Sequence, residues 1–115
     1  LVGTIILSSS NTSRVRLLND PQSSIGARIL SSRSLGMIEG DADKNIYLNY
    51  ISNQDSVFYG DIVMTSEHGG FIPPEIVIGT VRDEANSASE TYKVLLIEPF
   101  VDFKKLENVL VVTDW

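Results

Sequence analysis

Ser66-Glu67-His68 bring together a hydroxyl, a carboxylate and an imidazole, the three groups of a serine hydrolase. A catalytic triad needs these groups in mutual contact, whereas adjacent side chains on an extended chain point to opposite faces. The sequence also lacks the Gly-x-Ser-x-Gly turn that presents the nucleophile in many hydrolases. We therefore interpret His68, the single histidine, as an exposed loop residue. A degenerate or cryptic serine hydrolase that uses Ser66 and His68 is the alternative.

Metal and cofactor sites have little support in the sequence. Asp41, Asp43 and Asn45 alternate as in a calcium loop, but Ile46 and Ser52 stand where such a loop needs a glycine and a bidentate glutamate. The absence of cysteine excludes disulfides, thiolate metal ligands and a cysteine nucleophile. We expect no catalytic residue, no metal and no cofactor.

The segment that follows His68 is a candidate apolar contact loop. It combines backbone freedom at two glycines, two large apolar side chains and prolines that cannot donate to a sheet. In the alternative interpretation, Phe71 and Ile72 fill the core of a tight crossover. Adjacent side chains on an extended segment face opposite ways, so we expect at least one of the two to be exposed. The predicted partner-binding residues are Gly69, Gly70, Phe71, Ile72 and Pro73.

The composition indicates one folded domain without a nucleic-acid surface. The chain has 115 residues, 43% of them hydrophobic, which suffices for one packed core. Its formal net charge of −6 and its 9 scattered basic residues argue against phosphate binding. No apolar run reaches the roughly 20 residues that span a bilayer. Because the sequence opens at Leu1 directly in an apolar run, we expect that it was cut from a longer protein.

The elements that must position these residues are short strands. Segments rich in β-branched and aromatic residues recur between Ser, Asn, Asp and Gly clusters, which is typical of an all-β barrel or sandwich. The period-2 pattern predicts that Ile46, Leu48 and Tyr50 share one face of their strand. One short helix is expected from Asp102 to Val109. The predicted strands are 1–7, 13–19, 26–31, 36–39, 45–51, 61–65, 76–82, 90–98 and 109–113.

Several ordered blocks of the sequence resemble the MreC family of rod-shape-determining proteins. The most specific block runs Gly60-Asp61-Ile62-Val63-Met64-Thr65-Ser66, then Gly69-Gly70-Phe71-Ile72-Pro73, then Ile76-Val77-Ile78-Gly79-Thr80-Val81. It is similar to the family pattern GD-x-V-x-TSG-x-GG…P-x-G-I-x-x-G-x-V. Further blocks resemble the family at 13–20 with Ser24, at 36–40 and from 98 to 111.

The resemblance marks a set of residues as structural and also shows departures. Glu67 and His68 stand where a Gly-Leu pair is usual, and Glu75 stands where a glycine is usual before Ile76. Glycine adopts positive φ freely and glutamate only at a cost, so these departures bear on the backbone path of the loop. The residues marked as structural are Asp20, Gly36, Gly40, Gly60, Asp61, Thr65, Ser66 and Gly79.

The resemblance implies an all-β fold, a small six-stranded antiparallel β-barrel of chymotrypsin-like topology with extra C-terminal strands. Residues 1–115 would form a single fragment, the C-terminal barrel domain. The last strands, about 90–115, would pack against an upstream barrel that the sequence lacks. The family's barrels carry no catalytic triad, in agreement with our interpretation of Ser66 and His68.

The function implied by the resemblance is that of a non-enzymatic scaffold outside the cytoplasmic membrane. Such a scaffold maintains cell shape by organising the peptidoglycan elongation machinery. The implied partners are a second copy of the chain, in a homodimer or filament, together with MreD, RodA and a class B penicillin-binding protein. The membrane would be reached only through a missing N-terminal helix. A small-ligand-binding barrel is a third possibility, which requires an apolar cavity with convergent polar groups.

Overall fold

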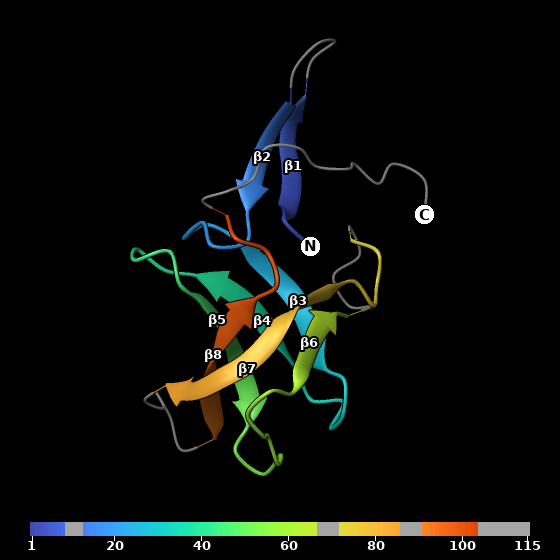
Figure 1. Cartoon of the computed structure of the whole chain (residues 1–115), viewed down its shortest axis with the longest axis vertical. Helices are drawn as coiled ribbons and strands as arrows, with labels where there is room; N and C mark the ends of the chain where they lie inside the picture. The colour runs from blue at the N-terminus through green and yellow to red at the C-terminus, as the bar shows by residue number, and fades with distance from the viewer. Residues whose placement is uncertain (9–12, 67–71, 86–90, 104–115) are drawn as a thin grey trace.

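The computed structural model describes residues 1–8, 13–66, 72–85 and 91–103 of the chain. All the elements in this part of the chain are β-strands, and Figure 1 shows a barrel with a separate hairpin. The strands are β1 (Gly3–Ser8), β2 (Ser13–Leu17), β3 (Ser24–Ile29), β4 (Leu35–Gly40), β5 (Ile46–Ser52), β6 (Ile62–Thr65), β7 (Val77–Ala85) and β8 (Tyr92–Pro99).

Six strands close into an antiparallel barrel in the order β3-β4-β5-β8-β7-β6. Counted along the chain from β3 to β8 as 1 to 6, this order is 1-2-3-6-5-4, the Greek-key arrangement of chymotrypsin-like barrels. The barrel closes where β3 meets β6, with Ala27 opposite Thr65 and Ile29 opposite Val63. The predicted fold class, an all-β six-stranded antiparallel barrel, is confirmed.

Strands β1 and β2 form a two-stranded antiparallel sheet that projects from one end of the barrel (Figure 1). Leu18, the residue after β2, is completely buried in the barrel core. Its backbone N–H donates to the carbonyl of Val2 at 2.9 Å, so the base of the hairpin is fixed where the chain enters the barrel. The additional strands in the described part of the chain therefore precede the barrel.

The interior of the barrel is filled by aliphatic side chains at alternate strand positions. On β5, Ile46, Leu48 and Ile51 are buried, whereas Tyr50 is 56% exposed. The prediction that Tyr50 shares a face with Ile46 and Leu48 is wrong, because the β5–β8 register shifts between Leu48 and Ile51. The bulge places Tyr50 at a φ of 67° and reverses the alternation after Leu48. The buried set is Leu18, Ile25, Ala27, Ile29, Ile38, Ile46, Leu48, Ile51, Val63, Ile78, Val81, Leu95 and Ile97.

Most predicted strands are found within two or three residues of their predicted bounds. The strand predicted at 26–31 runs from Ser24 to Ile29, because a tight turn follows in which the N–H of Arg33 donates to the carbonyl of Ile29 at 2.8 Å. Arg33 lies at a φ of 59°, which ends the extended chain. The predicted strand 109–113 lies outside the described residues, and so does nearly all of the predicted 102–109 helix.

Strand β8, in the first part of the 90–115 segment, lies between β5 and β7 and belongs to this barrel. That the end of the segment packs against an upstream barrel stays a prediction. Among the described residues, no helix is long and apolar enough to span a bilayer. The same residues include no group of three or more acidic or histidine side chains suited to a metal ion.

Truncation of the core should destabilise the barrel far more than truncation of its surface. Leu48 is fully buried and Leu30 is 46% exposed, so the two leucines form a matched pair. Leu48→Ala should lower the free energy of unfolding by about 2–5 kcal/mol. Leu30→Ala should change it by about 0.5 kcal/mol or less. Urea denaturation of both variants measures the difference, and equal losses would contradict the assigned core.

Candidate partner-binding groove

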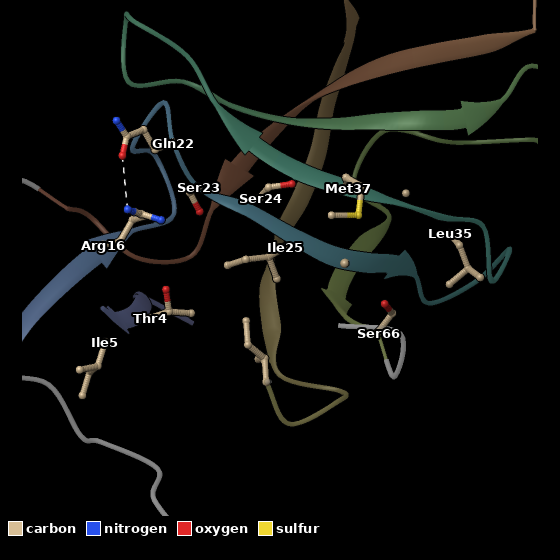
Figure 2. Close-up of a pocket in the computed structure, with 13 residues that line it drawn as sticks. Thr4, Ile5, Arg16, Gln22, Ser23, Ser24, Ile25, Leu35, Met37 and Ser66 are labelled. Atoms are coloured by element: carbon tan, nitrogen blue, oxygen red, sulfur yellow. Dashed lines mark hydrogen bonds between the residues drawn. The ribbon is translucent and has the colours of Figure 1, made fainter. Parts of the chain in front are cut away.

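A hollow of about 770 Å³ lies between the hairpin and the outer side of β3 and β4. Figure 2 shows β1 and β2 on one side of it and the barrel strands on the other. One end is closed by Ser66, which precedes the loop predicted to bind a partner, and by Ile72, which belongs to that loop. The lining residues are Thr4, Ile5, Arg16, Gln22, Ser23, Ser24, Ile25, Gly26, Leu35, Gly36, Met37, Ser66 and Ile72.

The lining of the groove combines aliphatic and methionine side chains with hydroxyl and amide groups and the guanidinium of Arg16. Ile5 and Leu35 are 41% and 48% exposed, so large aliphatic side chains are open to a binding partner. The guanidinium of Arg16 donates to Oε1 of Gln22 at 3.3 Å on the rim (Figure 2). None of the described lining residues carries a carboxylate or an imidazole. Such a surface can bind an apolar segment, and its described part supplies no acid or base for catalysis.

The loop beside the groove is held at both ends by Thr65, which is completely buried. Its hydroxyl donates to the carbonyl of Pro73 at 2.7 Å and accepts from the N–H of Ile76 at 2.9 Å. Its backbone N–H donates to the carbonyl of Ile76 at 2.9 Å, and its carbonyl accepts from the N–H of Glu75 at 3.0 Å. One residue thus fixes where the 66–74 segment begins and ends.

Glu75 adopts the backbone conformation that the family pattern assigns to glycine. Its φ is 64°, in the left-handed region that residues with a Cβ rarely enter. Its carboxylate accepts a hydrogen bond from the guanidinium of Arg28 on β3 at 3.2 Å, and the two groups form an ion pair. The side chain of Glu75 is exposed to solvent in this pair. A glutamate thus stands at a φ that glycine adopts without a steric cost.

The predicted structural residues Asp20 and Gly40 lie together beside the groove. Oδ1 of Asp20 accepts from the N–H of Gln22 at 2.8 Å, which fixes the turn between β2 and β3. A Cβ at Gly40 would lie 2.5 Å from the carbonyl oxygen of Asp20. Only glycine lets the two backbones approach this closely. Gln22 and Ser23, in this turn, line the groove.

The other predicted structural residues are spread over the barrel. Gly60 has a φ of 87° in the turn before β6, where Oδ2 of Asp61 accepts from the N–H of Phe58 at 2.9 Å. Gly36 lies in β4 at the groove, and Gly79 lies in β7. Ser66 is buried next to β3, and its N–H donates to the carbonyl of Gly26 at 3.1 Å.

The predicted partner-binding segment is only partly described. Ile72 is half-buried, packs against the core cluster and also lines the groove. Pro73 accepts the Thr65 hydrogen bond. Gly69, Gly70 and Phe71 lie outside the described residues, as does His68, so the contact of Ser66 with an imidazole stays untested.

The sequence analysis missed the hairpin and β4 sides of the groove. One segment carries Ile5, and another carries Leu35 and Met37. The two segments lie more than 25 residues apart in the sequence and meet only after folding. The signal for these two sides in the sequence was weak. It consisted of two large apolar residues, Ile5 and Leu35, in strands that have one solvent-exposed face.

The family model described as "Rod shape-determining protein MreC, barrel core" matches residues 1–113. The chain belongs to the MreC family. A cell shape-determining protein MreC from Bacillus subtilis (strain 168) is 33% identical over 97% of this chain and 42% of its own length. The chain therefore spans less than half of that relative.

Solved MreC structures share the fold. One, described as the major periplasmic domain from the cell shape-determining filament MreC, has a TM-score of 0.74 at 22% identity over 89% of this chain and 65% of its own. Another, described as a complex between penicillin-binding protein PBP2 and MreC from Helicobacter pylori, has a TM-score of 0.74 at 20% identity over 87% of this chain and 62% of its own.

The hydroxyl of Thr65 should contribute more to the free energy of unfolding than its methyl group. Thr65→Val keeps the volume but leaves the carbonyl of Pro73 and the N–H of Ile76 without their partner. We expect a loss of about 1–3 kcal/mol in unfolding free energy. Thr65→Ser keeps the hydroxyl and should cost about 0.8 kcal/mol for the lost methyl group. Thermal or urea unfolding decides, and a valine variant as stable as the serine variant would contradict the assigned hydrogen bonds.

Glycine at position 75 should give a more stable protein than alanine at the same position. Glu75→Gly and Glu75→Ala both remove the carboxylate that pairs with Arg28, but only alanine keeps a Cβ at positive φ. The glycine variant should therefore be the more stable of the two by about 1 kcal/mol. Parallel urea titrations measure this difference. An alanine variant of equal or greater stability would exclude the left-handed conformation.

Proposed function

We propose that the chain is the extracytoplasmic barrel of a non-enzymatic scaffold, and that it binds a penicillin-binding protein through the groove beside the 66–74 loop. The observation that carries the proposal is the apolar lining formed by the exposed side chains of Ile5 and Leu35 and the half-buried Ile72. Protein interfaces have such an apolar centre with a polar rim. The described complex of an MreC protein with PBP2 in Helicobacter pylori supports a partner of this kind.

We further propose that this contact organises peptidoglycan elongation and so maintains cell shape. MreD, RodA and a second copy of the chain are the other expected partners. The description of a related domain as periplasmic and as part of a filament supports a place outside the cytoplasmic membrane and self-association. Attachment to the membrane through an N-terminal helix belongs to the same proposal.

Binding rather than hydrolysis is also favoured by what surrounds Ser66. The serine is 3% exposed, and the described residues that line the groove include no carboxylate. A nucleophile requires access to substrate and a nearby base. We therefore propose that Ser66 is a structural residue of the loop.

Loss of an apolar side chain from the groove should weaken the penicillin-binding protein complex. Ile5→Ser removes a 41% exposed groove residue and should raise the Kd for the extracytoplasmic part of that enzyme at least about tenfold. Val77→Ser is the matched control, because Val77 is also 41% exposed but lies outside the groove. Surface plasmon resonance measures both. Equal Kd values for wild type and Ile5→Ser would place the contact elsewhere.

Cell-shape function should survive removal of the hydrolase-like side chains. Ser66→Ala and His68→Ala are each expressed in a strain that lacks its own mreC gene, and rod shape is scored by microscopy with protein abundance checked by immunoblot. We expect rods in both cases, because a scaffold needs neither group for chemistry. Loss of rod shape in both variants at normal abundance would favour the hydrolase alternative.

A further inference from the structure

An apolar surface covers the outer wall of the barrel over β5 and β8, on strands that do not line the groove. On β5 the buried residues are Ile46 and Leu48, so Tyr47 between them points outward. On β8 the buried residues are Leu95 and Ile97, so Leu96 points outward. The register pairs Tyr47 directly with Leu96. We call the set Tyr47, Tyr50, Tyr92, Val94 and Leu96 the tyrosine wall.

One tyrosine of this wall, Tyr50, is held out by a strained bulge on β5. Tyr50 has a φ of 67°, which is unusual for a bulky side chain in a strand. The bulge turns it away from the core, where it is 56% exposed and meets the ring of Tyr92 edge-on, with 6.0 Å between centroids and 87° between planes. A left-handed tyrosine costs free energy without adding to the core, and such strain commonly occurs at binding sites.

Carboxylates flank the tyrosine wall on both sides. The register places Glu39 of β4 opposite Tyr47, and Asp83 of β7 opposite Leu96, so one row across four strands reads Glu39, Tyr47, Leu96, Asp83. The amide of Asn49 donates to Oε1 of Glu39 at 2.5 Å, and Oδ1 of Asp83 accepts from the N–H of Glu84 at 2.8 Å. No described cation forms an ion pair with either carboxylate. Arg82, which precedes Asp83 in the sequence, forms an ion pair with Glu98 instead.

We propose that the tyrosine wall is a second docking surface, and that it binds a segment of another protein in which apolar side chains alternate with Lys or Arg. Tyrosine is enriched at binding hot spots, and the flanking carboxylates complement a basic partner. A second copy of this chain is a poor occupant, because the interface would bring Glu39 and Asp83 of one copy against those of the other in a chain of net charge −6. With the groove, this surface would let the scaffold hold two partners at once.

The experiment places a photoreactive benzoylphenylalanine at position 50 of the intact protein in the bacterium that makes it. This residue keeps an aromatic ring at the bulge. The matched control carries it at position 58, because Phe58 is 67% exposed but lies in the turn before β6. Mass spectrometry identifies the cross-linked peptide. We expect cross-linking at least fivefold above the control, to a protein other than this chain, at a peptide that carries Lys or Arg beside apolar residues.

Two pairs of charge variants test the electrostatic part of the proposal, and the first pair removes the charges with little change in side-chain shape. Glu39→Gln with Asp83→Asn should lower the cross-link at least twofold, and Glu39→Lys with Asp83→Lys at least fivefold, at normal protein abundance. Unchanged cross-linking in both pairs would overturn the proposal. So would a cross-link to a second copy, a peptide without basic residues, or a yield no higher than at position 58.

Discussion

The buried hydroxyl of Thr65 and the closure of the barrel at the same residue determine the rest of the structure. Thr65 lies opposite Ala27 where β6 meets β3, so the residue that seals the barrel also binds both ends of the 66–74 segment. A buried hydroxyl without partners would be costly, and these partners exist only when Pro73 and Ile76 return to β6. The position of Ile72 beside the hairpin follows from this constraint, and with it one end of the groove.

The barrel separates stability from recognition. Its interior consists of aliphatic side chains, and its polar residues mainly fix turns, as Asp20, Asp41 and Asp61 do with backbone N–H groups. Because a closed barrel leaves no free strand edge, a partner of the barrel itself contacts side chains on the outer wall or in the space beside the hairpin. Apolar side chains are exposed in both places, which agrees with the scaffold role proposed above.

The sequence predicted the fold well, because period-2 patterns and turn residues are local signals. It identified the strands and pointed to position 75, where the glutamate does adopt positive φ. It misplaced Tyr50, because a bulge on β5 is decided by pairing with β8, more than 40 residues away. Long-range packing also limited the prediction of the groove. Ile72 could be singled out from its own segment, whereas Ile5 and Leu35 come together only through the packing of the hairpin.

Hydrogen exchange of the chain with and without the extracytoplasmic part of the penicillin-binding protein tests the groove most directly. If the groove is the contact surface, backbone amides near Ile5, in the 35–37 segment and at Ile72 should exchange more slowly in the complex, since binding excludes water and restrains local opening. Amides of the turn around Gly60, at the far end of β6 from Thr65, should not change. Complex formation with unchanged exchange in all three groove segments would contradict the account.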